Sequence, residues 1–349
     1  MATTRRDLLG SFAGIAFVGC GLIGEARSQA PRQRREVVVN GRRIRTVDIH
    51  AHCAVPEAMA LMGRKVTPEA LVVSQDRIAA MDAQGIDMEA LSINPYWYNA
   101  ERDLAQQIIK LQNDRLAEIC AEQPDRFVAF GTVALQYPDL AAEQLETAMK
   151  KLGLRGTLIG GSVNGEELSD AKFHPFWAKA EELGAVIFIH PQGTAELAPR
   201  LKGNGVLTNV IGNPLETTIA LSHLIFEGTL DRFPGLKICA AHGGGYLPSY
   251  AARSDAGCAT FPDRCTIALK KEPTEYLKQL YYDSLVFTPE GLRHLIAEVG
   301  ASQIVMGTDY PYPWTKTAVD HILATPGLSD DERAALLGDT AAHLLGIHG

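Results

Sequence analysis

The sequence predicts a single (β/α)8 TIM barrel of the α/β class. From residue 46 onward, short apolar runs alternate with amphipathic helical segments, a pattern that favours βαβ units and a parallel sheet. Eight such units in about 300 residues fit a closed barrel. A doubly wound open sheet is the alternative, but it usually carries a glycine-rich fingerprint after its first strand. The expected strands are Thr46–His50, Met88–Asn94, Phe127–Ala134, Gly156–Gly160, Ala185–His190, Leu236–His242, Leu280–Ser284 and Gln303–Asp309.

The expected helices lie between these strands. In the one that begins at Asp103, the residues Leu104, Ile108 and Leu111 recur at the spacing of a helix that packs against a sheet. No internal repeat and no change of composition marks a second domain, so we expect one barrel over residues 46–349. The predicted helices are Gln75–Gln84, Asp103–Glu122, Asp139–Leu152, His174–Leu183, Pro214–Arg232 and Pro289–Val299.

The composition is that of an ordinary globular protein. Of the 349 residues, 46% are hydrophobic and 21% are charged, and the formal net charge is −8. There is no basic excess and no stripe of arginine and lysine, which argues against a nucleic-acid partner.

Residues 1–30 have the pattern of a twin-arginine signal peptide. Arg5 and Arg6 precede an apolar run over residues 12–23, and the small-residue sequence Ser-Gln-Ala ends at residue 30. The apolar run is shorter than a membrane-spanning helix needs. We therefore expect a periplasmic or secreted protein with no membrane segment after cleavage. A frayed N-terminal helix of a cytoplasmic protein is the alternative.

Residues 31–45, rich in arginine and glutamine, are expected to be a linker to the barrel. The cysteines show no zinc-finger spacing. Cys258 and Cys265 share a loop-like stretch, where they either pair in an oxidising periplasm or remain two free thiols. Lipidation at Cys20 is a further alternative to cleavage after residue 30.

Metal-binding side chains stand at four of the eight expected strand ends. His50 and His52 belong to the first strand end, His190 to the fifth, His242 to the sixth and Asp309 to the eighth. Because barrel active sites lie at the carboxyl ends of the strands, we expect these side chains to meet. Three imidazoles and a carboxylate suit Zn²⁺ and leave a position for water, whose pKa the ion lowers toward neutrality. A fourth histidine can then carry a proton.

These motifs resemble the amidohydrolase superfamily. They are His-Ala-His in the first strand, His190 in the fifth, His-Gly-Gly-Gly from His242 and Gly-Thr-Asp-Tyr-Pro around Asp309. The segment YYDSLVFTPEGLRHLIAEVGASQIVMGTDYPYP is very similar to the last third of the branch that includes 2-amino-3-carboxymuconate semialdehyde decarboxylase and related aromatic-acid decarboxylases. The resemblance covers nearly all of residues 46–349.

The resemblance implies a role for each of the five residues. His50, His52, His190 and Asp309 would bind the metal, and His242 would be catalytic, sharing the movement of a proton with Asp309. A two-metal centre in this superfamily needs a bridging lysine or glutamate after the fourth strand, and the sequence GTLIGG offers neither. We therefore expect one divalent ion, most simply zinc.

Two further residues are candidates for substrate binding. Arg253 stands where relatives place an arginine that reaches a substrate carboxylate, in the semialdehyde decarboxylase from the neighbouring subunit, which implies a homodimer. A helix-surface arginine is the alternative. Trp97, after the second strand, is expected either to form an aromatic wall for a planar substrate or to lie in the core. Gln192 departs from the semialdehyde decarboxylases, which have tryptophan there.

The function expected is metal-dependent, non-oxidative decarboxylation of an aromatic or unsaturated carboxylic acid, with a small-molecule substrate. Metal-dependent hydrolysis of a lactone, ester or amide is the alternative. A non-catalytic exported metal-binding protein fits less well, because four ligands and a spare histidine exceed what storage needs.

Overall fold

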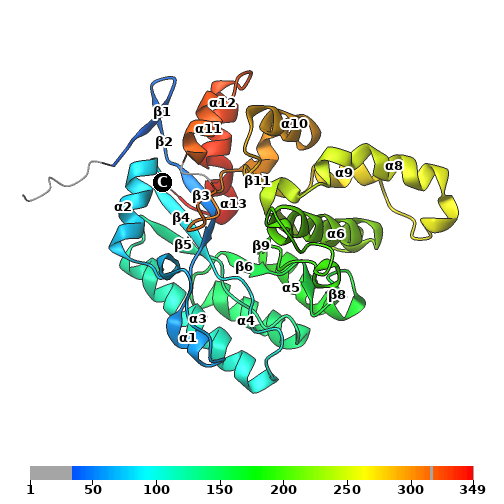
Figure 1. The fold of residues 1–349 in the computed structure, drawn as a ribbon, viewed down its shortest axis with the longest axis horizontal. Coiled ribbons are helices and arrows are strands. Elements are labelled where there is room, and N and C mark those ends of the chain that lie inside the picture. The colour runs from blue at the N-terminus through cyan, green and yellow to red at the C-terminus, as the bar shows by residue number, and fades with distance from the viewer. Residues whose placement is uncertain (1–33, 315–316, 349) are drawn as a thin grey trace, which may run out of the picture. The chain divides into compact units, whose positions relative to one another are not determined.

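The computed structural model describes residues 34–314 and 317–348, and these form a parallel barrel (Figure 1). One sheet has the order β3-β4-β5 and the other the order β6-β9-β10-β11-β12, with every neighbouring pair parallel. The strands are β3 (Val47–His52), β4 (Met88–Ser92), β5 (Phe127–Ala129), β6 (Gly156–Ile159), β9 (Val186–Ile189), β10 (Lys237–Ala240), β11 (Tyr281–Asp283) and β12 (Ile304–Val305). All eight predicted strands are present.

Backbone hydrogen bonds connect the two sheets at both seams. Between β5 and β6, the Gly131 amide donates to the Gly156 carbonyl at 2.8 Å. Between β3 and the segment after β12, the Ile49 amide donates to the Met306 carbonyl at 2.9 Å, and the His52 amide donates to the Tyr310 carbonyl at 2.7 Å. The prediction of a (β/α)8 barrel is therefore confirmed, and the first and last strands lie side by side.

Alternate residues of the strands fill the interior of the barrel. Val186 and Phe188 of β9 belong to one buried cluster together with residues of the last helix, and Ile187 and Ile189 belong to the larger cluster under the surrounding helices. This is the period of two expected of strands that are buried on both faces. His190 follows Phe188 at that period, so it continues the inner face at the carboxyl end.

The helices surround the strands much as predicted. The expected helix over residues 214–232 is divided into two, because Gly228 adopts a left-handed φ of 73° and ends the first segment. The helices are α1 (Pro56–Ala60), α2 (Gln75–Gln84), α3 (Arg102–Glu122), α4 (Pro138–Lys150), α5 (His174–Leu183), α6 (Asn213–Phe226), α7 (Thr229–Arg232), α8 (Ala251–Thr260), α9 (Pro273–Leu277), α10 (Pro289–Val299), α11 (Ala318–Ala324), α12 (Asp330–Ala334) and α13 (Thr340–Leu345). Of the helices described, none has the length and apolarity to cross a membrane.

The structure differs from the expected linker over residues 31–45. β1 (Val37–Val39) and β2 (Arg42–Ile44) form an antiparallel hairpin, and Val37, Val39 and Ile44 are buried in the outer core. Asn40 and Gly41 make the turn, both with positive φ, as a two-residue hairpin requires. A second small hairpin, β7 (Ser162–Val163) and β8 (Glu166–Glu167), has the same Asn-Gly turn. The predicted signal peptide and Cys20 lie outside the described residues.

Asp87 attaches this N-terminal hairpin to the barrel. Its carboxylate accepts two hydrogen bonds from the Arg43 guanidinium, at 2.6 and 2.9 Å, and one from the Thr46 amide at 2.9 Å. Burial alone would raise the pKa of Asp87, but the Arg43 and Thr46 donors outweigh it and hold that pKa below its ordinary value. A carboxylate with a lowered pKa stabilises the fold above its unfolded pKa near 4, and that contribution is lost as the pH falls through the folded pKa.

Replacing Asp87 with asparagine is expected to reduce the free energy of unfolding by about 2 kcal/mol at pH 7, because charge-assisted hydrogen bonds are lost. The loss should shrink below about pH 4, where the carboxylate of the unfolded chain takes up a proton, and shrink further as the pH falls through the lower folded pKa. Urea unfolding at pH 7 and pH 3.5 measures both effects. Asp339→Asn is the control, because its ion pair with Arg42 on the same hairpin is exposed. Equal losses in the two variants at pH 7 would contradict this anchoring role.

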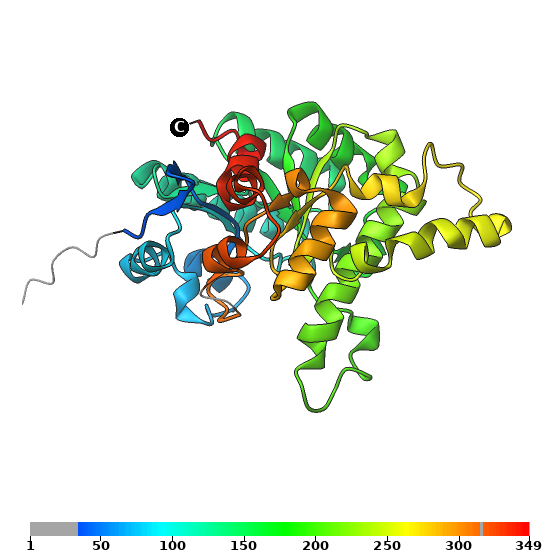
Figure 2. The ribbon, with the colours of Figure 1, turned by 90° about the horizontal axis from the view of Figure 1, so that it is seen from above.

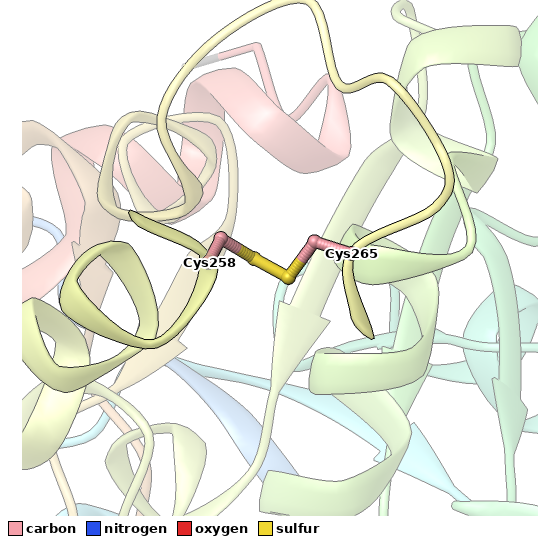
Figure 3. The surroundings of a disulfide bond; sticks show 2 residues. All are labelled: Cys258 and Cys265. Atoms are coloured by element: carbon pink, nitrogen blue, oxygen red, sulfur yellow. A yellow bond between two sulfur atoms is a disulfide. The ribbon is translucent and has the colours of Figure 1, made fainter. Parts of the chain in front are cut away.

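α8 projects beyond the ring of helices in both views (Figures 1 and 2). A disulfide bond joins Cys258 near its end to Cys265 in the following loop, with a Cα–Cα distance of 5.6 Å (Figure 3). Of the two alternatives that the sequence leaves open, the structure therefore has the paired one. The free cysteines among the described residues are Cys53, Cys120 and Cys239.

Candidate metal centre

The five side chains that the sequence places at strand ends meet at the carboxyl end of the barrel. The Nε2 atom of His50 lies 3.1 Å from Nε2 of His52 and 3.2 Å from Oδ1 of Asp309, and His52 Nε2 lies 2.9 Å from the same oxygen. The His190 ring centroid lies 4.6 Å from that of His52. His242 Nε2 lies 3.8 Å from Oδ2 of Asp309. These residues come from four strand ends that are far apart in sequence, and the barrel brings these ends together.

Asp48 fixes the two strand ends that carry three of these residues. Its Oδ1 accepts hydrogen bonds from the His50 amide at 2.9 Å and the Thr308 amide at 3.1 Å, and its Oδ2 accepts one from the Thr308 hydroxyl at 2.5 Å. The pairing of β3 with β4 shifts register between Asp48 and Ala51, which is an irregularity of the bulge type. Asp309 itself, four residues after the last strand ends at Val305, adopts a left-handed φ of 59°.

Two of the imidazoles are oriented by partners on their Nδ1 atoms. His50 Nδ1 lies 2.6 Å from Oδ2 of Asp283, and His52 Nδ1 lies 3.3 Å from the hydroxyl of Ser92. Each contact leaves Nε2 directed into the cluster, which is the usual arrangement of metal-binding histidines. Asp283 is not among the site residues that the sequence motifs predict. Its position at the end of β11 was the available signal, but its partner His50 lies on a strand far away in the sequence.

Asp283 also supports the segment that carries His242. Its two carboxylate oxygens accept hydrogen bonds from the backbone amides of His242 and Gly243, each at 2.9 Å. His242 has a left-handed φ of 56°, so this short turn needs external partners to hold it. One buried carboxylate therefore positions two of the five clustered residues.

The charges of the cluster suit a divalent cation. Burial raises the pKa of Asp309, but the surrounding histidines outweigh it and hold the pKa well below its usual range. Burial lowers the pKa of His50, yet the carboxylates of Asp309 and Asp283 raise it to about 10. Burial lowers the pKa of His52 to about 4. Two buried carboxylates thus share one site with imidazoles of which at least one is neutral, and a cation there balances their charge.

The donor atoms themselves also fit a metal. Both ring nitrogens of His190 and Nδ1 of His242 are buried with no hydrogen-bond partner among the described residues. Buried polar atoms without partners are rare and often mark the place of an ion. Ligands about 2.1 Å from one ion lie roughly 3.0–3.5 Å apart, and the separations of 2.9, 3.1 and 3.2 Å among His50, His52 and Asp309 are close to the short end of that range.

Geometry alone also admits a second ligand set. Ligand atoms of His50, His190, His242 and Asp309 all lie within 4.8 Å of one another, so His242 is near enough to compete with His52. His52 is the closer to Asp309, however, and its side chain is 1% exposed, whereas that of His242 is 16% exposed. The more accessible ring is the better placed to meet a substrate.

A pocket opens above the cluster. It has a volume of about 450 Å³, within the range of small-molecule sites, and adjoins an apolar lobe of about 120 Å³. His190, His242 and Asp309 form part of its lining, and the remaining residues are Asn94, Pro191, Gln192, Asn209, Asn213, Tyr312, Pro313 and Trp314. The position of the pocket matches the expected site at the carboxyl ends of the strands.

The two predicted substrate-binding residues lie away from this pocket. Trp97 is fully buried, and its indole Nε1 donates to the Val133 carbonyl at 2.9 Å, so of its two expected roles the structure shows the core position rather than the aromatic wall. Tyr312 and Trp314 supply the aromatic side chains instead. Arg253 is exposed on α8 and does not line the pocket within the described chain.

The barrel and its five-residue cluster define an α/β protein with a candidate centre for a divalent metal at the carboxyl ends of its strands. A profile of the amidohydrolase family matches residues 47–347. The chain belongs to this family, as its sequence motifs predict.

Known proteins resemble the chain over most of its length. It is 33% identical over 280 residues to 2-amino-3-carboxymuconate-6-semialdehyde decarboxylase of Dictyostelium discoideum, covering 78% of this chain and 76% of that one. The structure of 5-carboxyvanillate decarboxylase from Sphingomonas paucimobilis matches with a TM-score of 0.80 at 26% identity, covering 87% and 100% of the two chains. A dihydroxybenzoic acid decarboxylase from Polaromonas sp. JS666, solved with manganese and the inhibitor 2-nitroresorcinol, matches with a TM-score of 0.78 at 28% identity, covering 86% and 97%.

Proposed function

We propose that the protein is a metal-dependent, non-oxidative decarboxylase of an aromatic or unsaturated carboxylic acid. The observation that carries this proposal is the His242 and Asp309 pair beside a centre of metal-binding residues at the floor of a small-molecule pocket. The relatives described above are named as decarboxylases, which supports the same reaction.

The residues present fit the steps of such a reaction. Decarboxylation replaces the bond between a carbon and its carboxylate with a bond to hydrogen, so a proton must reach that carbon as CO₂ leaves. The bound ion would hold the substrate and withdraw electron density from it. His242 and Asp309, 3.8 Å apart at the pocket floor, would hold the proton and deliver it. The electrons of the broken bond return to the substrate, and no water is consumed.

Product analysis on purified, metal-loaded protein tests the proposal. With a panel of aromatic acids, we expect one CO₂ for each decarboxylated product and no oxygen incorporated from labelled water. His242→Ala should keep its metal and lose about 10²- to 10⁴-fold in kcat, because it removes a proton carrier. Ring opening of a lactone or release of an amine, without CO₂, would show that the protein is a hydrolase and not a decarboxylase.

We propose zinc as the ion, because three imidazole nitrogens and one carboxylate are ligands that zinc favours. The manganese in neighbouring structures is the competing choice. Elemental analysis of protein purified without added metal should return about one equivalent of zinc. A full equivalent of manganese would correct this assignment.

We propose that the protein is exported through a twin-arginine signal to the periplasm or beyond. The Cys258–Cys265 disulfide supports this, because such bonds persist in oxidising compartments. Replacing Arg5 and Arg6 with lysine should retain the protein in the cytoplasm, which fractionation would reveal.

We also propose a homodimer in which Arg253 reaches the pocket of the partner. Beside Arg253 on the projecting α8 segment, Tyr250 is 70% exposed and Phe261 is 62% exposed, and a second copy would cover these rings. Mass measurement in solution tests the dimer. Mixing inactive Arg253→Ala and His242→Ala chains should restore part of the activity if Arg253 acts across the interface.

A further inference from the structure

His190 differs from the other two imidazoles expected to bind the metal, because no described side chain holds its ring by a hydrogen bond. Asp283 contacts Nδ1 of His50 at 2.6 Å, and Ser92 contacts Nδ1 of His52 at 3.3 Å. Both ring nitrogens of His190 lack a hydrogen-bond partner among the described residues. Metal-binding histidines usually have a partner on the second nitrogen that fixes the ring. The direction of the His190 ring therefore depends on the backbone that carries it.

A carboxylate from α6 holds the backbone that follows His190. At His190 itself, the amide donates to the Ile159 carbonyl at the end of β6, at 3.0 Å. Two and three residues later, the amides of Gln192 and Gly193 both donate to Oε2 of Glu216, the first of them at 2.5 Å. Gly193 has a left-handed φ of 102°, which glycine adopts without strain in a tight turn. The short segment from His190 to Gly193 is thus held at both ends.

The end of β6 leaves room for the Glu216 side chain. Glu216 is only 5% exposed, and a Cβ atom at Gly161 would lie 2.8 Å from its Cγ and 3.1 Å from its Oε1. Because a packed interior has no slack for such a contact, a larger residue at position 161 would displace the carboxylate. The absence of a side chain there lets Glu216 lie against the end of β6 while it binds the turn after β9.

This position of the carboxylate carries an electrostatic cost. Burial raises the pKa of Glu216 to about 7, and the Gly193 and Gln192 amides oppose that rise. A buried charged group is seldom a net gain in stability over an apolar side chain of similar size. What the carboxylate adds is a fixed place for two consecutive amides, and with them the turn that follows His190.

We propose that Glu216 is a positioning residue of the metal centre, whose carboxylate holds the turn after β9 and so directs the His190 imidazole toward the ion. The inference rests on the metal centre of the proposed function, and it is independent of which reaction that centre catalyses. Glu216 is not among the residues that line the pocket, so its effect reaches the ion through the backbone of the turn.

Titration of the metal-free protein with Co²⁺ tests this inference, because the visible absorption of bound Co²⁺ reports the geometry of its ligands. Glu216→Met keeps the approximate size of the side chain but removes the acceptor. We expect it to bind Co²⁺ about 10- to 100-fold more weakly, with an altered spectrum. Glu216→Gln keeps an acceptor oxygen and should stay within about fivefold of the wild type, because only the charge assistance of the two hydrogen bonds is lost.

Glu181→Met is the matched control. The Oε1 atom of Glu181 also accepts a backbone hydrogen bond, from the Gly235 amide at 2.6 Å. Gly235 precedes the amino end of β10, however, and so lies at the opposite end of the strands from the metal centre. This variant should leave the Co²⁺ affinity and the spectrum unaltered.

Two results for Glu216 would overturn the inference. One is wild-type affinity with a wild-type spectrum in Glu216→Met. The other is a Glu216→Gln protein that binds Co²⁺ as weakly as Glu216→Met, because the acceptor oxygen would then have no part in placing the ligand.

Gly161→Ala tests the same contact without removing the carboxylate, and circular dichroism shows whether each variant is folded. The added methyl group should displace Glu216, weaken Co²⁺ binding and alter the spectrum in the same direction as Glu216→Met. If Glu216→Met does not fold, unaltered Co²⁺ binding in Gly161→Ala would overturn the inference.

The titration separates this inference from the proposed function, because it does not depend on turnover. Failure of the wild-type protein to bind Co²⁺ would reject the metal centre, and the inference with it. Wild-type binding that does not respond to the changes at Glu216 would reject the inference alone and leave the proposed function standing.

Discussion

His52→Ala is expected to lose its metal while the barrel stays folded. The substitution removes an imidazole whose Nε2 lies 3.1 Å from His50 Nε2 and 2.9 Å from Asp309 Oδ1. Changing even a supporting partner of a metal ligand typically lowers affinity 10- to 100-fold, so the loss of a ligand should lower it by about 100-fold or more. The strand retains its backbone pairing, so the fold should survive. Elemental analysis after dialysis, with circular dichroism on the same sample, measures both.

His242→Ala is the matched control for this prediction. It removes the same ring from the same cluster, but from the more exposed position 3.8 Å from Asp309. We expect it to keep its metal. If His52→Ala kept a full equivalent of metal and His242→Ala lost it, His242 would be the metal ligand and His52 would not. The ligand set would then be His50, His190, His242 and Asp309.

Arg77→Met is expected to destabilise the barrel by about 3–5 kcal/mol, because it leaves a buried carboxylate without its partner. The Arg77 guanidinium is completely buried, and its Nε donates to Oε2 of Glu89 at 2.6 Å. Its Nη1 donates to the His52 carbonyl at 2.7 Å, and its central carbon lies 4.6 Å from the centre of the Tyr310 ring. Arg77 therefore holds both sides of the seam between β3 and the segment after β12.

Thermal or urea unfolding measures the loss of unfolding free energy in Arg77→Met. Arg102→Met is the control, because the ion pair of Arg102 with Asp139 is exposed and should contribute under about 1 kcal/mol. The double variant Arg77→Met/Glu89→Leu should recover part of the stability, since no buried charge is left unpaired. We expect reduced metal affinity in both Arg77→Met and the double variant, because in each the His52 carbonyl lacks its partner. Full recovery of metal binding in the double variant would show that Arg77 acts only as the ion-pair partner of Glu89, and that its contact with the His52 carbonyl does not support the metal site.

The strands and the cluster could be predicted because their signals are local. Each strand is an apolar run, and His50, His190, His242 and Asp309 each stand at the end of one, where the barrel geometry brings them together. The exact ends were less predictable. The last strand stops at Val305 rather than Asp309. The segment after it bonds to β3 through single backbone contacts and through the contacts of Thr308 with the Asp48 carboxylate.

The remaining features depend on contacts that no local pattern reveals. Asp283 acquires its role from His50, and Trp97 is drawn into the core by a hydrogen bond to Val133 from a different strand end. The N-terminal hairpin is different, because its Asn40-Gly41 turn is a recognisable local signal. The arginine-rich composition around it suggested a linker, yet Arg43 turns out to be the partner of buried Asp87.

The seam between the first and last strands links metal capture to the completion of synthesis. His50 and His52 emerge early from the ribosome, but Asp309 belongs to the segment made after all eight barrel strands. Only a chain that has closed its barrel presents all the ligands together, so a nascent or truncated chain holds at most a weak, partial site. Tight metal binding would therefore report that folding is complete.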